Sequence, residues 1–393
     1  MNYGSASHKS HTRSLPPTSW LLDSGSWLLL PLDIAQNNAS ESVPRLTQPT
    51  DLTDMDISRR QFLIKASSSV AAGWVLSHSL QPDCAGAEEV NSIPLATPVF
   101  LMSYPQWESV SDYRPVLNGT ATSVIFERTI AKSTVLYSLD LTNPNAVPTK
   151  FTPGLTSSFR ADWSWQTGEV VYMNSAGIYL SSAPNTPIAG TSNMTYPTWY
   201  PDAATLAVYN NRAHQPEALP IPRTSKMNLR CTVLEQVLAN DSVWAGFPSV
   251  NQTNSNLIAF AGQVAQSGGS YNQDKNYIWL TDTSTTPHTV RTLAPGAPTN
   301  KFDPNYQGRA PWYSPDGKWI AFESNRFNSS GLYSIFIQVA DGSKPAVRVT
   351  DPRWNANHAK WYPNGTELVV TVLQSFAAID RGIAKLDVSA FVA

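Results

Sequence analysis

The chain has 393 residues, of which 41% are hydrophobic, 10% are aromatic and only 14% are charged, with a formal net charge of −2. This composition favours a large folded core rich in β-structure, and it lacks the basic surplus of a nucleic-acid-binding protein. Beyond residue 87, no apolar run reaches the roughly 18 residues of a membrane span, so we expect no stable membrane insertion of the mature protein.

The first 54 residues are rich in Ser, Pro, Thr and Leu and do not continue into a periodic segment. We interpret residues 1–54 as a disordered extension or as an upstream extension of the reading frame, because Met55 is a natural start. A genuine cytoplasmic extension is the alternative.

Residues 55–87 have the three parts of an export signal in the expected order. Arg59 and Arg60 form the charged start, Phe62 and Leu63 begin a weakly apolar stretch, and the small residues 85–87 offer a cleavage site. Paired arginines followed by Phe-Leu resemble the twin-arginine family of export signals. That resemblance implies export of a folded protein to the periplasm or the exterior, and the alternative is a chance Arg-Arg pair before an ordinary amphipathic helix.

The chain contains two cysteines, Cys84 and Cys231. Cys84 falls within the segment that we expect to be removed, so Cys231 is left alone and no intramolecular disulfide is expected in the mature chain. Cys231 lies in a strand-like apolar segment, which favours a buried small side chain over a reactive thiol.

From residue 88 onward, one pattern returns six times: an aromatic or apolar residue, a polar turn and an apolar run. The clearest copy contains Tyr313, the turn Ser314-Pro315-Asp316-Gly317 and the apolar run that ends at Phe322. The six copies occupy residues 115–126, 161–172, 197–208, 248–260, 310–322 and 359–370. Aligned on the aromatic position, they carry Leu117, Trp163, Trp199, Val250, Tyr313 and Trp361.

The repeated pattern is typical of a β-hairpin, because Pro and Gly meet the backbone demands of a tight turn between two strands. Further short apolar runs follow each copy, which makes four strands in roughly 50 residues, a usual length for a propeller blade. We therefore predict that residues 88–393 form an all-β, six-bladed propeller of four-stranded antiparallel blades, with seven blades as the alternative. The ring must close, so we expect residues 98–102 to supply the outer strand of the last blade.

The copy from Pro311 to Phe322 resembles the repeat of TolB-like propellers, also described as WD40-like or PD40 repeats. The resemblance covers roughly residues 98–390 and implies fold more than function, because the motif residues make turns and packing contacts. TolB proteins carry an α/β domain before the propeller, which this sequence does not show, so a Tol-Pal role is in doubt. The repeat is also similar to prolyl-oligopeptidase propellers, but no Gly-x-Ser-x-Gly motif follows it.

Candidate ligand-binding residues follow from the alignment, because the strand before each turn should be innermost. Three positions ahead of the aromatic stand Arg114, Arg160, Tyr196, Phe247, Ala310 and His358, and one step earlier stand Tyr113, Phe159, Thr195, Gly246, Arg309 and Asn357. We expect Arg114, Arg160, Arg309 and His358 to gather at one channel mouth, where they could bind a carboxylate or phosphate. The alternative is that these arginines are solvated on separate rims or bond loop carbonyls.

Catalytic residues are harder to find in this sequence. After the signal the only histidines are His214, His288 and His358, and none are spaced as a metal-binding pair. His358 with Asn357 and Asp351 is the one cluster that could hold a channel metal, and a structural histidine is the competing interpretation. We expect no cofactor, with a divalent cation in the channel as the open alternative.

The sequence therefore favours an exported cell-envelope binding or scaffolding protein, monomeric, that binds an envelope protein or peptide through a propeller face or channel mouth. The alternative is a metal-dependent hydrolase or lyase that acts on a sugar or lactone.

Overall fold

Short apolar strands joined by tight turns form six antiparallel sheets, as the repeated pattern predicts. The computed structural model describes residues 93–104, 109–152, 154–213, 215–221, 227–228, 244–263, 272–299 and 301–393. The extension 1–54, the export-signal residues Arg59, Arg60, Phe62 and Leu63, and both cysteines lie outside the described residues.

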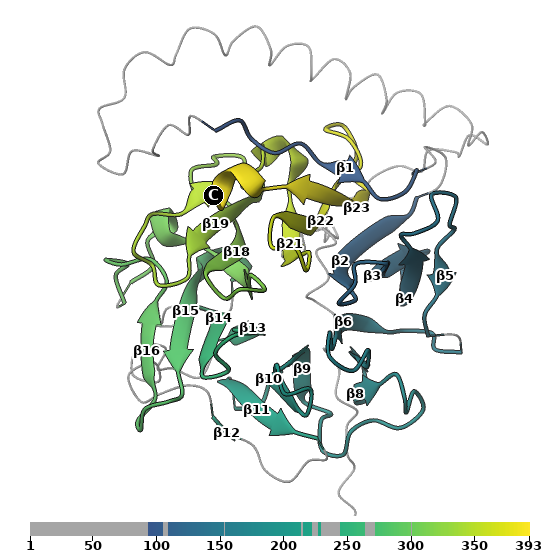
Figure 1. The fold of residues 1–393 in the computed structure, drawn as a ribbon, viewed down its shortest axis with the longest axis horizontal. Helices are drawn as coiled ribbons and strands as arrows, with labels where there is room; N and C mark the ends of the chain where they lie inside the picture. The colour runs from purple at the N-terminus through teal and green to yellow at the C-terminus, as the bar shows by residue number, and fades with distance from the viewer. Residues whose placement is uncertain are drawn as a thin grey trace, which may run out of the picture. The chain divides into compact units, whose positions relative to one another are not determined.

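The sheets are arranged as blades around a central axis, with the first strand of each blade nearest the centre (Figure 1). From the centre outwards, blade 1 contains β2 (Ser111–Leu117), β3 (Ser123–Ile130), β4 (Ser133–Asp140) and β5 (Thr149–Lys150). Blade 2 contains β6 (Phe159–Trp163), β7 (Val170–Asn174) and β8 (Gly177–Leu180). Blade 3 contains β9 (Met194–Trp199), β10 (Thr205–Asn210), β11 (Gln215–Pro220) and β12 (Met227–Asn228). Blade 4 contains β13 (Ala245–Val250), β14 (Leu257–Gln263), β15 (Asn276–Asp282) and β16 (Thr289–Thr292). Blade 5 contains β17 (Arg309–Tyr313), β18 (Trp319–Ser324), β19 (Ser334–Val339) and β20 (Val347–Arg348). Blade 6 contains β21 (Asn357–Trp361), β22 (Glu367–Leu373), β23 (Arg381–Asp387) and β1 (Val99–Phe100).

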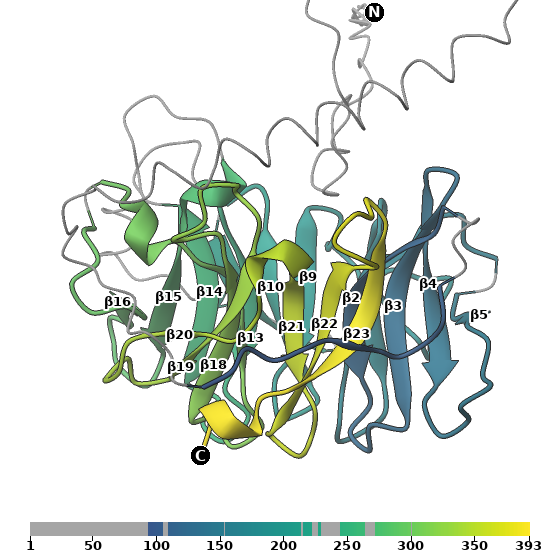
Figure 2. The same ribbon diagram turned by 90° about the horizontal axis from the view of Figure 1, so that it is seen from above.

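The predicted six-bladed propeller is confirmed. Figure 2 shows it from the side, with the strands running from one face of the propeller toward the other. In blade 2 an irregular segment takes the fourth position: the Ile188 amide donates to the Ile178 carbonyl at 2.8 Å, and the Ile178 amide donates to Thr191 Oγ1 at 3.0 Å. Among the described residues, no helix is long and apolar enough to cross a membrane.

Apolar side chains fill the spaces between neighbouring blades. Between blades 6 and 1, for example, Val369 and Ile383 pack with Val124 and Phe126, and all four are fully buried. Each blade thus covers its faces with the next, which is why the propeller needs a closed ring.

Strand β1 closes that ring, as predicted for residues 98–102. Val99 pairs with Lys385 and Phe100 pairs with Ala384, so the first described strand completes the sheet that contains the last one. The Phe100 ring packs edge-on against Tyr104 and Trp354, with centroid distances of 5.8 and 6.3 Å. The closure therefore combines backbone pairing with a side-chain anchor.

The innermost strand of every blade contains a β-bulge at the same register. In blade 5, Arg309 pairs with Glu323 and Trp312 pairs with Ala321, so two residues of β17 oppose one residue of β18. The other five blades repeat this shift. The first bulged residue has a φ between 48° and 54° in all six blades: Arg114, Arg160, Tyr196, Phe247, Ala310 and His358.

Glycine adopts this left-handed conformation without strain, whereas a residue with a Cβ is disfavoured by about 1 kcal/mol or more. None of the six bulge positions is glycine. Since strained residues of this kind gather at functional sites, the bulge residues direct attention to the channel that they face.

Closure by β1 can be tested with two neighbouring substitutions. Phe100→Ala removes the aromatic anchor and should lower the free energy of unfolding by about 2–3 kcal/mol, somewhat below the cost at a fully buried site. Val99→Ala should change it by less than about 0.5 kcal/mol, because Val99 is 61% exposed. Urea denaturation of both variants measures the difference, and equal losses would contradict an anchoring role for Phe100.

Strain at the bulge can be tested with one substitution at two sites. Ala310→Gly relieves a left-handed alanine and should leave stability unchanged or raise it by up to about 1 kcal/mol. Ala321→Gly, on the adjacent strand with ordinary strand geometry, should lower stability by about 1 kcal/mol. Chemical denaturation separates the two, and a loss at Ala310 as large as at Ala321 would argue against strain.

Candidate functional site

The six bulge residues line one cavity at the propeller axis, together with the prolines and alanines that follow them. This arrangement brings Arg114, Arg160 and His358 together from blades 1, 2 and 6, as the alignment predicted. Their role in binding a ligand stays a prediction.

The cavity has a cationic half, which holds Arg114 and Arg160 beside His358, and an apolar half. His358, Arg114 and Arg160 come from three consecutive blades, and Tyr196, Phe247 and Ala310 come from the other three. The rings of Tyr196 and Phe247 lie 4.3 Å apart, and the Arg160 guanidinium lies 3.8 Å from the centroid of the Tyr196 ring. A ligand in this cavity meets positive charge on one side and apolar surface on the other.

Two buried carboxylates hold the cationic half in place. Glu127 Oε1 accepts a 2.7 Å hydrogen bond from the Arg160 amide, and its Oε2 accepts one from Arg114 Nη1 at 2.9 Å. Each bond involves a bulge residue, and the first one joins blades 1 and 2. Glu127 thus satisfies an amide that the bulge removes from the strand ladder.

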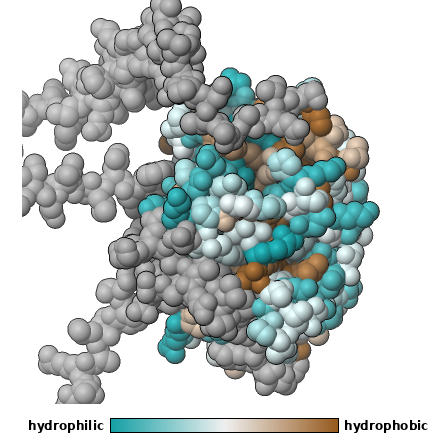
Figure 3. Space-filling model, turned by 90° about the vertical axis from the view of Figure 1, so that its left-hand side faces the viewer, coloured by the Kyte–Doolittle hydropathy of each residue, from teal (hydrophilic) through white to brown (hydrophobic). Residues whose placement is uncertain are grey.

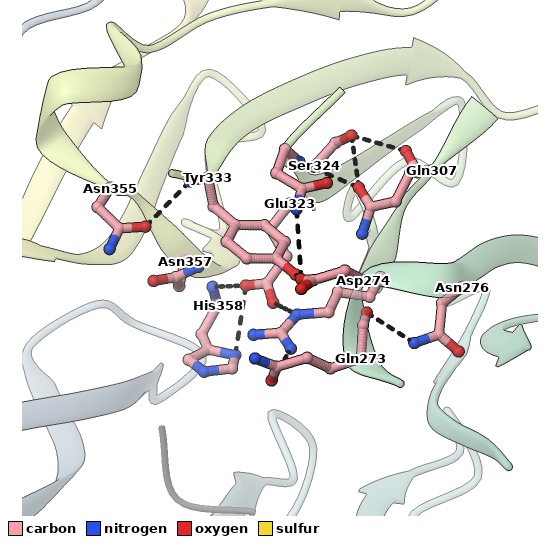
Figure 4. Close-up of polar contacts among 12 residues, drawn as sticks. Gln273, Asp274, Asn276, Gln307, Glu323, Ser324, Tyr333, Asn355, Asn357 and His358 are labelled. Carbon is pink, nitrogen blue, oxygen red and sulfur yellow. Dashed lines mark hydrogen bonds and ion pairs between the residues drawn. The ribbon is translucent and has the colours of Figure 1, made fainter. Parts of the chain in front are cut away.

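Glu323 does the same between blades 5 and 6 (Figure 4). Its Oε2 accepts a 2.6 Å hydrogen bond from the His358 amide and lies 3.5 Å from His358 Nδ1, and its Oε1 accepts from Arg309 Nε. Arg309 also donates to Gln273 Oε1 at 2.6 Å and lies over the Tyr333 ring. Arg309 therefore lies behind the cavity, linked to His358 through Glu323, and does not line it.

Arg381 is a further cation at this end of the channel that the sequence did not reveal. It begins β23, the third strand of blade 6, and its Nη1 donates to Asn357 Oδ1 at 2.6 Å and to the Asn355 carbonyl at 2.9 Å. Because the aligned repeat positions fall on inner strands, a residue of the third strand is not among them.

His358 lies close enough to these arginines for their positive charges to affect its pKa. Burial lowers the pKa of His358 well below its usual 6.5, and the positive charges of Arg114, Arg309, Arg381 and Arg160 lower it further. The imidazole is therefore neutral at physiological pH. It can donate or accept one hydrogen bond at the wall of the cavity.

An ion pair crosses the channel below this cavity. Lys360 Nζ of blade 6 lies 3.0 Å from Asp162 Oδ1 of blade 2 and 3.7 Å from the centroid of the Trp312 ring. Asp162 Oδ2 also accepts hydrogen bonds from Thr198 Oγ1 and the Trp199 amide. Lys360 and Trp312 line both this cavity and a second, aromatic one on the side of the hairpin turns, so they separate the two.

A larger hollow lies outside the channel, between the outer strands of blades 4 and 5. Leu280, Val290 and Val339 lie among its lining residues, and Arg291 and Lys344 also line it. Figure 3, which faces this side of the molecule, shows apolar residues in a hollow between hydrophilic ones. None of the bulge residues lines this hollow.

The residues considered for a metal do not converge. Asp351 binds Arg353, Asn357 binds Arg381, and four arginines oppose a divalent cation beside His358. Within the described ranges, no three His, Cys, Asp or Glu side chains form a group that could hold a metal ion. His288 contacts the Thr285 carbonyl in an exposed loop, and His214 lies outside the described residues.

No protein-family profile and no curated protein matches this chain. Similar solved structures include a protein described as TolB from Agrobacterium tumefaciens, with 15% identity over 73% of this chain and 79% of that one and a TM-score of 0.37. A Vibrio parahaemolyticus oligogalacturonate lyase has 9% identity over 75% and 97%, with a TM-score of 0.44. A Xanthomonas campestris gluconolactonase has 9% identity over 74% and 89%, with a TM-score of 0.48. At these values the likenesses carry no argument about activity.

The lowered pKa of His358 predicts a loss of stability in acid. The unfolded chain binds a proton near pH 6.5, whereas the folded chain does so only at much lower pH, so stability falls by up to about 1.4 kcal/mol per pH unit below 6.5. His358→Gln removes this contribution. Urea denaturation at pH 7.5 and pH 5 measures the free energy of unfolding of both proteins. Relative to the variant, the wild type should be about 2 kcal/mol less stable at pH 5 than at pH 7.5. A difference that does not change with pH would contradict a buried neutral histidine.

Proposed function

We propose that this protein is a binding protein whose channel mouth takes the terminal carboxylate of a peptide or protein partner. The observation that carries the proposal is the convergence of Arg114 and Arg160 on one cavity, with Arg309 and Arg381 behind it. Glu127 pairs with Arg114 and Glu323 pairs with Arg309, so the two carboxylates hold these guanidinium groups in place. Guanidinium groups in a partly dry site bind carboxylates through charge-assisted hydrogen bonds.

The shape of the site favours the end of a peptide chain as the ligand. The ion pair of Lys360 and Asp162 lies across the channel below the cavity, which favours a ligand that enters with one end. The apolar half, formed by Tyr196, Phe247 and Ala310, favours an apolar side chain beside the carboxylate. The proposed ligand is therefore a C-terminus whose last residue is apolar or aromatic.

We also propose that the protein works in the periplasm or outside the cell after export by the twin-arginine route. The support for this is the sequence around Arg59 and Arg60. The alternative of a metal-dependent hydrolase or lyase gains no support from the described residues, among which no three His, Cys, Asp or Glu side chains form a group that could hold a metal ion. Elemental analysis of the purified protein separates the two functions, since a stoichiometric divalent metal would favour the enzyme.

Calorimetric titration with acetyl-Gly-Gly-Phe tests the binding proposal. The peptide with a free carboxylate should bind, and its C-terminal amide should bind at least about tenfold more weakly, because a charged hydrogen bond is lost. Arg160→Met should weaken binding of the free acid by a similar factor and leave binding of the amide unchanged.

Lys318→Met is the matched control, because Lys318 is an exposed cation of the hairpin turn in blade 5 that makes only a surface ion pair. This variant should bind as the wild type does. Equal affinity for acid and amide, or an unchanged affinity of Arg160→Met in a protein with a normal thermal melt, would contradict the proposal.

A further inference from the structure

A second cation is buried away from the channel, between blades 4 and 5. Arg326 follows β18, is only 8% exposed, and lines a small cavity whose walls include Ile278, Leu293 and Phe322. Tyr306 and Gln338 also line this cavity, which has room for about one water-sized particle. The cavity shares no residue with the channel mouth, so a ligand bound here would be independent of the proposed function.

The protein gives Arg326 only neutral partners. Arg326 Nε donates to the Gln307 carbonyl at 3.0 Å and to Ser324 Oγ at 3.1 Å. The guanidinium lies between the rings of Phe322 and Phe336, 5.0 Å from each centroid. Among the described residues, no carboxylate forms an ion pair with this guanidinium, and the hydrogen bonds that it donates within the protein come from Nε.

Arg326 nevertheless keeps its charge. Burial alone lowers the pKa of Arg326 to about 10, which leaves the group protonated at neutral pH. A buried charge is expensive without a counter-ion, and two aromatic faces offset only part of that cost. What the site lacks, within the described residues, is a negative charge close to the Nη atoms of Arg326.

We propose that the cavity beside Arg326 binds a single chloride-sized inorganic anion. The small volume favours a monatomic anion over sulfate, phosphate and organic acids, and the cationic wall favours an anion over water. The neighbouring Gln338 donates to the Leu293 carbonyl of blade 4 at 3.5 Å and to the Lys344 carbonyl of its own blade at 2.9 Å. The anion would therefore occupy a joint between two blades and stabilise it.

Thermal unfolding at constant ionic strength tests this proposal. Chloride or bromide replacing gluconate should raise the melting temperature saturably, by about 2–4 °C when the halide reaches ten times its dissociation constant. Arg326→Met should abolish the halide-specific rise. Arg353→Met is the control, because Arg353 is an exposed arginine that also lies over an aromatic ring, and its variant should keep the rise.

Anomalous diffraction from wild-type crystals grown in bromide keeps the test independent of whether Arg326→Met folds. A bromide peak in the cavity beside Arg326 is the expected result. A water molecule without anomalous signal at that position, or a melting temperature that responds equally to halide and gluconate, would overturn the proposal.

Discussion

The left-handed residue in the inner strand of each blade is the constraint on which the rest of this propeller depends. It creates a bulge, and the bulge removes one backbone amide from the ladder of its own sheet. In three blades that amide finds an acceptor side chain on the preceding blade: Thr371 for Arg114, Glu127 for Arg160 and Glu323 for His358. The same distortion that turns side chains toward the axis therefore also binds blade to blade.

Glu127 and Glu323 show how stability and binding chemistry share the same atoms. Each carboxylate joins an arginine of its own blade to the next blade, so the arginines are oriented before any ligand arrives. Oriented donors lose less conformational entropy on binding than free side chains do.

Much of the fold could be predicted because its signals are local. The turn and aromatic of each repeat fix a hairpin, and ring closure by residues 98–102 follows from the need to cover the last blade. The bulge was not predicted, since Arg114 or His358 gives no sign of a left-handed backbone. One sequence signal for the bulge was available: a proline two residues before the aromatic position, as at Pro197 and Pro311. Proline has no backbone N–H to donate to the hydrogen-bond ladder of a sheet, so within a strand it often marks a bulge.

The parts of the site that sequence could not supply come from outside the compared strand or from across the ring. Arg381 reaches Asn357 of the inner strand from the third strand of blade 6, and Lys360 meets Asp162 across the intervening blade 1. Only three-dimensional placement joins such residues. The alignment did find Arg114, Arg160 and His358, because equivalent positions in a repeat occupy equivalent places around its axis.

The pairing of β1 with β23 has a consequence for the order of assembly. The partners stand near opposite ends of the described chain, so blade 6 cannot be completed until synthesis has reached its last strand. Contacts of such long range form slowly. Loss of either strand would leave the other without its partner in blade 6.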